Sequence, residues 1–341
     1  MRRGTQCQDR PDITVAVCTY NRAELLPGVL EDLSRQETGG EFAFEILIVD
    51  DGSTDDTQDV VNRCASQIKV PLRYVRSEGA GVGAARNTAV REFIADWIAF
   101  IDDDETADPN WLRELYTTAM KTGGLIVGGP VRLVLPEEQL ARLSPLCQLV
   151  LGGFEYPFAE PSRFPSNESP ATANVLLNGG VFSSVGLFDT RGSAGEDTNL
   201  WGRARAAGLE MWYAPGAVVH HYVPAERLEE SYFRWNSMRW GDCFAQDDWQ
   251  AHGLVITLLA CVARAAKALI VIFPLLLLAL VCGDEKKALE RRCALWRAAG
   301  YARRCLFLVA PRVFPQKSFF AYLDFRNQKD ASAGTEKRHE S

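Results

Sequence analysis

The chain has 341 residues, of which 47% are apolar, so it can bury a sizeable core in one large or two smaller domains. Its formal net charge of −7 is unevenly distributed. Residues 283–341 carry 13 Lys/Arg against 7 Asp/Glu, whereas residues 1–282 carry 24 against 37. An acidic main body argues against nucleic acid as the partner, and a basic tail favours a membrane face rich in anionic lipid.

Cysteine usage and the N-terminal residues bear on the compartment. The nine cysteines form no C-x-x-C pair and most lie in apolar runs, so we expect small core residues in a reducing compartment. Residues 1–11 are polar and contain no apolar run of the kind found in a secretory signal. We therefore expect the chain to be cytoplasmic.

Three short apolar strands are predicted near the start of the chain, and each runs into polar residues. They cover residues 13–18, 45–49 and 97–101. Residues 23–36 have the amphipathic spacing of a helix, and a second helix is predicted at residues 57–67 after a Ser/Asp cap. This alternation predicts an α/β fold with a doubly wound, mostly parallel sheet, which binds ligands where its strands end.

Acidic runs follow two of these strands. The second strand leads into Asp50 and Asp51, and the third leads into Asp102, Asp103 and Asp104. Adjacent carboxylates repel one another unless a cation or hydrogen-bond donors relieve the repulsion. Mg²⁺ and Mn²⁺ favour oxygen ligands and are commonly completed by a substrate diphosphate. An acidic run taken alone also fits a solvated turn or a helix start.

A glycine-rich stretch covers residues 79–86 and ends in Arg86. Glycines before a helix allow close backbone approach to a diphosphate, and Arg86 adds a cation there. The stretch follows the strand signal at residues 72–75 rather than the first strand, and it lacks the G-x-G-x-x-G spacing of a dinucleotide site. Hydride transfer with NAD therefore stands as a secondary alternative.

Five strings follow one another along the chain: VAVCTYNR (15–22), ILIVDDGSTDDT (46–57), GAGVGAARNTAV (79–90), WIAFIDDDETADPNWL (97–112) and GEDTNLWGRARAAG (195–208). Their order and spacing resemble those of family 2 glycosyltransferases, which have the GT-A fold. The resemblance implies transfer of a sugar from a nucleotide-diphosphate sugar.

The resemblance also implies a division of the chain. A GT-A catalytic domain would cover residues 11–225, with a nucleotide-sugar half at 11–128 and an acceptor half at 129–225. A helical, partly apolar C-terminal extension would follow at 226–325, and residues 326–341 would form a disordered polar tail.

In the resembling family, the acidic run and a later histidine bind a metal. Asp104, the last acid of its run, would coordinate Mn²⁺ or Mg²⁺, while Asp102 or Asp103 would contact the ribose or reach the metal through water. His221 would be a further ligand, since imidazole suits Mn²⁺. His220 would point to the opposite face if the strand continues.

The nucleotide would bind beside the metal. The resemblance puts Asp51 at the nucleobase, with Thr19 and Tyr20 lining the same pocket and Arg86 near the nucleotide. A UDP-sugar is the expected donor.

The attacking hydroxyl needs a base to accept its proton. By resemblance Asp197 is that base, and Glu196 binds or orients the acceptor. Asn199 stands where many relatives have a second aspartate. Without the resemblance, two acids at the start of a helix are typical of an N-terminal cap.

The stretch at residues 254–282 is the most apolar part of the chain. Residues 268–282 form an uninterrupted apolar run, shorter than the ~20 residues that a simple spanning helix requires. Arg264 and Lys267 precede it, and Pro274 predicts a break or a kink. A membrane-surface helix and a buried packing helix both remain open, and a transmembrane hairpin is disfavoured.

The sequence thus predicts an inverting, metal-dependent hexosyltransferase-type enzyme that glycosylates a saccharide or glycolipid acceptor. Its expected setting is surface polysaccharide or glycolipid synthesis at the cytoplasmic membrane face, with peripheral membrane contact. A non-catalytic nucleotide-sugar-binding protein is the main alternative. A nucleotidyltransferase and an NAD-dependent enzyme are further alternatives.

Overall fold

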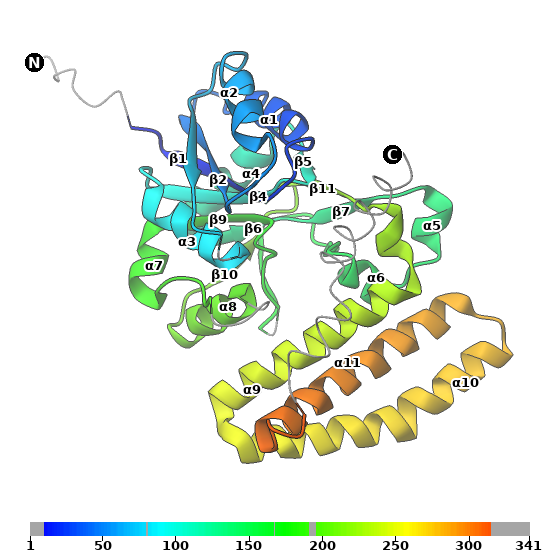
Figure 1. The fold of residues 1–341 in the computed structure, drawn as a ribbon. Helices are drawn as coiled ribbons and strands as arrows, with labels where there is room; N and C mark the ends of the chain where they lie inside the picture. The colour runs from blue at the N-terminus through cyan, green and yellow to red at the C-terminus, as the bar shows by residue number, and fades with distance from the viewer. Residues whose placement is uncertain (1–9, 80, 167, 191–195, 315–341) are drawn as a thin grey trace, which may run out of the picture. The chain divides into compact units, whose positions relative to one another are not determined.

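The computed structural model describes residues 10–79, 81–166, 168–190 and 196–314, and it divides into two compact units (Figure 1). The first unit comprises Met1–Val134 and Gly152–Tyr222. The second comprises Leu135–Leu151 and Val223–Ser341, so a short segment from the middle of the chain belongs with its C-terminal part. The polar tail expected at residues 326–341 lies outside the described residues.

The first unit is built on an eight-stranded sheet. From one edge to the other its order is β3 (Leu72–Arg76), β2 (Phe44–Asp50), β1 (Ile13–Thr19), β4 (Trp97–Asp102), β9 (Asn174–Asn178), β6 (Ile126–Gly128), β10 (Met211–Tyr213) and β8 (Ser162–Arg163). The pairs among β1 to β4 are parallel, as is β6 with β10, whereas β9 is antiparallel to both neighbours and β8 to β10. The mostly parallel, doubly wound α/β prediction is therefore confirmed.

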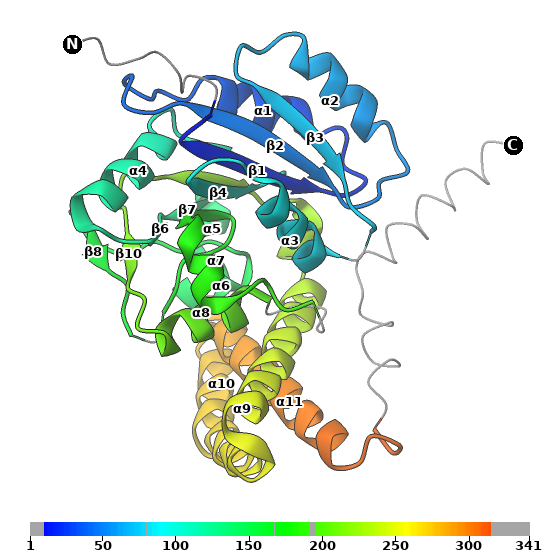
Figure 2. The same cartoon turned by 90° about the vertical axis from the view of Figure 1, so that its left-hand side faces the viewer.

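Helices cover both faces of this sheet. One face packs against α1 (Leu26–Ser34), α2 (Thr57–Ala65) and α4 (Trp111–Thr122), and the other against α3 (Val82–Glu92), α7 (Gly179–Val185) and α8 (Glu196–Ala206) (Figure 2). Successive strand residues alternate between the two cores, so Val15 and Val17 face one and Ala16 faces the other. Burial on both faces explains why the strands read as continuous apolar runs.

A single buried amide ties the centre of this unit together. Asn174 is fully buried, and its Oδ1 accepts a hydrogen bond of 2.8 Å from Trp111 Nε1. Its Nδ2 donates to the carbonyl oxygens of Pro130 and Ala217 at 2.9 and 2.7 Å. These bonds join β9 to α4 and to two connecting loops. An apolar side chain at this position would leave three hydrogen-bonding partners unsatisfied.

A second sheet in this unit has only three short strands. Its order is β5 (Glu105–Ala107), β11 (Val219–Tyr222) and β7 (Val131–Val134). β11 runs antiparallel to β5 and parallel to β7. Because β5 begins three residues after β4 ends, this small sheet brings the late strand β11 beside the acidic run.

The second unit is helical. It contains α5 (Glu137–Ala141), α6 (Pro145–Val150), a 3₁₀ turn at Ala225–Leu228, α9 (Glu230–Lys267), a π-helical turn at Ala268–Ile272, α10 (Phe273–Val281) and α11 (Glu285–Val309). α9 changes direction at Gly253, whose φ of 78° is unfavourable for other residues. From there the chain runs through α10 and returns along α11, so three long rods lie side by side (Figure 1).

Two glycines let α9 and α11 approach closely. A Cβ atom at Gly241 would lie 1.9 Å from the Arg297 carbonyl oxygen, and one at Gly300 would lie 2.0 Å from that of Met238. Beside this contact the buried Asp242 pairs with Arg304 at 2.5 Å. Small residues and an enclosed ion pair thus set the spacing of the two helices.

Pro274 does not end the helix. The π-helical turn Ala268–Ile272 ends two residues before it, and α10 continues beyond it to Val281. A proline lacks the backbone N–H that an α-helix needs, and a wider turn accommodates that loss. The break that the sequence suggested is therefore a local widening.

Candidate active site

Parallel pairing brings the carboxyl ends of β2, β1 and β4, with their polar residues, to the same end of the large sheet. This end of the sheet is called the acidic edge. In the register of β1 with its neighbours, Thr19 pairs with Asp50 and Cys18 pairs with Asp102. Asp51 continues this edge, since its backbone N–H donates to the Thr19 carbonyl oxygen at 2.8 Å. Tyr20 is 51% exposed at the same strand end. The predicted donor-site residues of these strands are therefore neighbours.

Asp103 lies at the centre of this edge and is nearly buried. Its Oδ2 accepts a hydrogen bond of 2.8 Å from Thr19 Oγ1, and its Oδ1 lies 2.6 Å from Arg22 Nη1. The same Arg22 nitrogen lies 3.3 Å from Asp104 Oδ2. Burial raises the pKa of Asp103 to about 6, against the opposing effect of Arg22, and the charge of Asp104 raises it further. One guanidinium therefore bridges two carboxylates of the acidic run.

The antiparallel pairing of β5 and β11 carries His221 to the acidic run. His221 is opposite Glu105 in the register, and its Nδ1 lies 3.6 Å from Asp104 Oδ1 and 3.7 Å from Glu105 Oε1. His220 points away and lies 2.9 Å from Asp108, as the strand alternation predicted. The two proposed metal ligands, 117 positions apart in the chain, are thus brought together.

These residues fit a hard divalent cation. An oxygen of Asp104 and the Nδ1 of His221, 3.6 Å apart, would be the protein ligands of such an ion. Groups of three or more His, Cys, Asp or Glu arranged to hold a metal are not found among the described residues. The chain thus offers a partial ligand set of the kind that substrate phosphates and water complete.

Glu105 is enclosed beneath this pair. It is 3% exposed, and its Oε2 accepts a hydrogen bond of 3.2 Å from the Asp102 backbone N–H. Burial, together with the charges of Asp102 and Asp104, raises its pKa well above the usual range. An additional cation near Asp104 and His221 would relieve this concentration of carboxyl groups.

Asp51 connects the strand end to the glycine-rich loop. Its Oδ1 accepts from Ser77 Oγ at 2.7 Å, and its Oδ2 accepts from the Gly81 backbone N–H at 2.8 Å. A Cβ atom at Gly52 would lie 3.2 Å from the Gly79 Cα, so glycine permits the two loops to touch. Asp51 therefore holds the loop that leads into α3.

Arg86 extends the charged edge from α3. It is 7% exposed, and its Nη2 lies 3.4 Å from Asp102 Oδ1. Asp50, the other acid that follows the second predicted strand, is fully buried and accepts hydrogen bonds from the Ser53 backbone and the Tyr74 hydroxyl group. These contacts give Asp50 a turn-stabilising role.

Among the described residues, the contacts of Asp197 are made within its own helix and not with the acidic edge. It lies in the first turn of α8, and its Oδ1 accepts a hydrogen bond of 2.7 Å from the Thr198 backbone N–H. This local contact is that of a residue at a helix start. The side chain of Glu196 lies outside the described residues. The base therefore stays a prediction.

Arg22 and Glu105 contact the candidate site residues, although the sequence motifs did not single them out. Both lie inside the quoted strings, directly after Thr19-Tyr20-Asn21 and directly after the Asp triplet. The sequence offers one electrostatic signal for Arg22. Three adjacent acids favour a nearby cation, and Arg22 is the first basic residue after the neighbouring strand.

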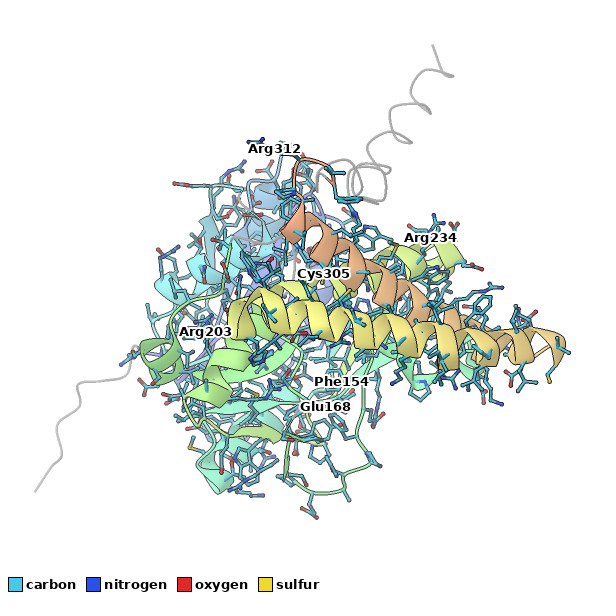
Figure 3. The ribbon with its side chains drawn as sticks, turned by 90° about the horizontal axis from the view of Figure 1, so that it is seen from below. Phe154, Glu168, Arg203, Arg234, Cys305 and Arg312 are labelled. Atoms are coloured by element: carbon cyan, nitrogen blue, oxygen red, sulfur yellow. The ribbon has the colours of Figure 1, made fainter. Side chains whose placement is uncertain are left out.

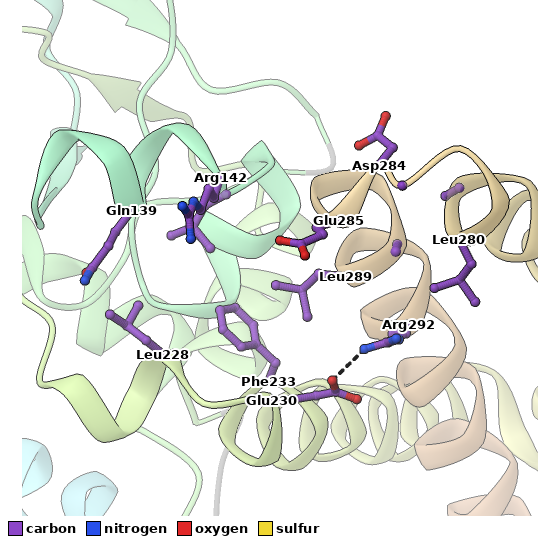
Figure 4. Close-up of a pocket in the computed structure, with 14 residues that line it drawn as sticks. Gln139, Arg142, Leu228, Glu230, Phe233, Leu280, Asp284, Glu285, Leu289 and Arg292 are labelled. Atoms are coloured by element: carbon purple, nitrogen blue, oxygen red, sulfur yellow. Dashed lines mark hydrogen bonds and ion pairs between the residues drawn. The ribbon is translucent and has the colours of Figure 1, made fainter.

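A cavity of about 650 Å³ lies in the second unit (Figure 4). Residues from α5, the start of α9 and the turn between α10 and α11 line it, and Glu230 and Arg292 pair across it at 2.5 Å. None of the predicted site residues belongs to its lining. The acidic edge of the first unit is therefore the better candidate for chemistry.

The mostly parallel, doubly wound sheet and its flanking helices match the GT-A glycosyltransferase fold of solved structures. A mannosyltransferase from Pyrobaculum calidifontis, solved with GDP-Man and Mn²⁺, matches with a TM-score of 0.57 and 18% identity over 86% of this chain and 88% of that chain. The chain belongs to glycosyltransferase family 2. The profile described as Glycosyl transferase family 2 matches residues 14–167, and that of Glycosyl transferase family group 2 matches residues 97–284.

Curated relatives include a biosynthesis protein and a glucosyltransferase. The succinoglycan biosynthesis protein ExoM of Rhizobium meliloti is 26% identical over 248 residues, which are 72% of this chain and 75% of that protein. The validoxylamine A glucosyltransferase of Streptomyces hygroscopicus subsp. jinggangensis is 31% identical over 59% of this chain and 53% of its own length. Family membership favours sugar transfer over the hydride-transfer and nucleotidyl-transfer alternatives.

Proposed function

We propose that this chain is an inverting, metal-dependent glycosyltransferase that moves a sugar from a nucleotide-diphosphate sugar to a hydroxyl group of a saccharide or glycolipid. The observation that carries the proposal is the meeting of Asp104 and His221, 3.6 Å apart, beside the Asp103–Arg22 pair. The matching mannosyltransferase, solved with GDP-Man and Mn²⁺, supports the choice of a divalent ion.

The acidic edge provides what the leaving group needs. Breaking the anomeric C–O bond leaves negative charge on a diphosphate, and that charge must be stabilised as it develops. Asp104 and His221 would hold a Mn²⁺ or Mg²⁺ ion, which when bound would supply Lewis-acid stabilisation of this charge. Arg22 offers a further positive charge at the same place, because its guanidinium already contacts both Asp103 and Asp104.

The neighbouring loops bind the nucleotide. Asp51 holds the loop after β3 through Gly81, and Arg86 places a buried cation beside Asp102. Thr19 fixes the Asp103 carboxylate, while the exposed ring of Tyr20 offers a stacking surface for a nucleobase. A UDP-sugar is the proposed donor.

Asp197 is the proposed general base. A carboxylate that accepts the proton of the attacking hydroxyl group supports direct displacement at the anomeric carbon, which inverts its configuration. The acceptor hydroxyl group is itself the nucleophile in this scheme, so the chain needs no residue that forms a covalent sugar intermediate. Glu196, the preceding residue, orients the acceptor.

The proposed setting is polysaccharide or glycolipid synthesis at the cytoplasmic face of a membrane. The resemblance to a succinoglycan biosynthesis protein supports a role in polysaccharide synthesis. The exposed apolar residues of the second unit support the membrane location. Processive synthases of the resembling family carry a Q-x-x-R-W signature. This chain has an Arg234-Trp235 pair without the glutamine, which argues against processive synthesis.

A thermal-shift panel tests the donor site. UDP-, dTDP- and GDP-sugars are added with and without Mn²⁺, because a ligand that binds only the native state stabilises it. At 100 times the dissociation constant the expected stabilisation is about 2.7 kcal/mol, and it should require the metal. Lack of stabilisation by every nucleotide sugar would overturn the proposal. Stabilisation without transfer to any acceptor would favour the nucleotide-sugar-binding alternative.

A further inference from the structure

The second unit exposes an unusually continuous apolar surface. Val255, Leu259 and Val262 in α9 are 71%, 65% and 67% exposed, Leu269 in the π-helical turn is 71% exposed, and Val281 at the end of α10 is 86% exposed. An isolated exposed leucine has no particular meaning, but a contiguous apolar patch is typical of an interaction surface. The helix from Glu230 to Val281 is also the one candidate membrane span among the described residues.

These side chains form one stripe. Apolar residues recur every three or four positions along the helical rod formed by residues 254–281, which places them on one side of the rod. They are Val255, Leu259, Val262, Ala266, Leu269, Phe273, Leu277 and Val281. Thr257, Ala268, Leu276 and Ala279 lie on the other side and are buried. At 1.5 Å per residue the stripe is about 40 Å long. One face therefore packs inside the unit and the other faces outward along the whole rod.

The charges near the stripe select its partner. Residues 253–314 contain ten Lys/Arg and three Asp/Glu, whereas the remainder of the chain contains 27 and 41. Lys267, Lys286 and Lys287 are exposed beside or at the end of the stripe. An apolar stripe flanked by basic side chains suits a bilayer that contains anionic lipid.

Arg264 lies within this stretch but is directed back into its own unit. Its guanidinium lies 4.5 Å from the centre of the Tyr301 ring and 3.8 Å from Asp248. The one arginine between Gly253 and Val281 is therefore held by α11 and by the first half of α9. The outward side of the rod therefore carries apolar side chains and Lys267.

The neighbouring helix distinguishes lying on a membrane from crossing it. α11 packs along the rod, and its sequence carries seven Lys/Arg and two Asp/Glu (Figure 3). A crossing orientation would draw these charges into hydrocarbon at a cost of about 2.5–3.5 kcal/mol for each one near the centre. An in-plane orientation inserts only the stripe and leaves α11 in the headgroup and water layers.

We propose that residues 254–281 form an in-plane membrane anchor that docks the chain on an anionic bilayer. The proposal deepens the membrane setting of the proposed function and rests on it. The anchor is monotopic, since its stripe lies at one depth along its whole length and α11 stays on the water side.

Vesicle sedimentation of the full-length chain tests this anchor. The variants Val255→Glu, Leu269→Glu and Val281→Glu place a charge at the two ends and the middle of the stripe. Met120→Glu in α4 is the matched control, because Met120 is 51% exposed outside the second unit. Vesicles of phosphatidylcholine alone are compared with vesicles in which about 30% of the lipid is phosphatidylglycerol. Both are used at low and at high salt.

An in-plane anchor predicts a loss of about tenfold or more in vesicle affinity for each of the three variants, at similar magnitude, and none for the control. Affinity should rise with phosphatidylglycerol and fall with salt. A loss confined to Leu269→Glu would indicate a crossing helix and overturn the proposal. Unchanged vesicle binding in all three would also overturn it.

Two further measurements separate the remaining outcomes. Sedimentation velocity without lipid detects a second copy on the stripe, and a wild-type dimer that the three variants dissociate would overturn membrane docking. Donor binding in the same variants, read by thermal shift with Mn²⁺, should equal that of the wild type. Failure of the membrane anchor with intact donor binding is thereby distinct from failure of the proposed transferase function.

Discussion

The two units arrange the same kinds of side chain in opposite ways. In the first unit, apolar residues fill both faces of the sheet, and charged groups gather at one edge. In the second unit, a long apolar stripe faces outward, while Asp242 and Arg304 pair between helices and Arg264 contacts the Tyr301 ring. The first arrangement suits a site for a charged ligand. The second suits surroundings that are less polar than water.

The largest expected effect concerns the charged edge. Asp104→Asn removes the carboxylate that is 3.6 Å from His221, so metal-dependent donor binding should be abolished while the fold persists. Calorimetric titration of the donor with and without Mn²⁺ measures this. Asp103→Asn is the comparison and should be milder, because it leaves the proposed ligand pair in place. Full Mn²⁺-dependent affinity in Asp104→Asn would contradict the metal assignment.

The next effect separates catalysis from binding. Asp197→Asn is nearly isosteric and keeps an oxygen that can accept from Thr198, so stability should change little. Transfer should fall by about 10²- to 10⁴-fold with nearly unchanged donor affinity, since only proton acceptance is lost. The transfer rate and the donor dissociation constant are measured on the same preparations. Transfer within a few-fold of the wild type would make Asp197 a structural residue and direct attention to Glu196.

A third prediction concerns the packing of the second unit. Gly300→Ala places a methyl group against the Met238 carbonyl oxygen, so α9 and α11 must separate, and stability should fall by about 1–3 kcal/mol. Gly202→Ala in α8 is the control, because nothing lies within 4 Å of its Cβ position. It should stabilise the chain by up to about 1 kcal/mol. Denaturant unfolding of both variants makes the comparison, and equal stabilities would contradict the close helix contact.

The smallest effect tests how firmly the acidic edge is held. Thr19→Val keeps the shape of the side chain but removes the hydroxyl group that donates to Asp103 at 2.8 Å. The free energy of unfolding should fall by about 1 kcal/mol. Thermal unfolding of the metal-free protein measures this. A greater loss would mean that Thr19 supports more of the edge than this one hydrogen bond.

Much of the first unit could be predicted because its signals are local. Buried parallel strands read as apolar runs, and the acids that follow them mark the edge where strands end. The meeting of Asp104 with His221 could be expected only through the family resemblance. Nothing in the sequence between them states that β11 pairs with β5, which is a contact between segments far apart in the chain.

The second unit was less predictable for a different physical reason. Hydropathy indicates that residues 254–282 are apolar, but it does not say which side of the helix finds a packing partner. The structure shows a buried side through Leu276 and Ala279 and an exposed side through Leu269 and Val281. The membership of Leu135–Leu151 in this unit was missed as well, because a short amphipathic segment carries no mark of its distant partners.

The pairing of β5 with β11 also constrains the order in which the site comes into being. During synthesis, the acidic run at residues 102–104 leaves the ribosome more than one hundred residues before His221 does. Until β11 docks beside β5, a nascent chain carries the carboxylates without their imidazole partner. The proposed cation site can therefore be assembled only on chains that are translated past His221.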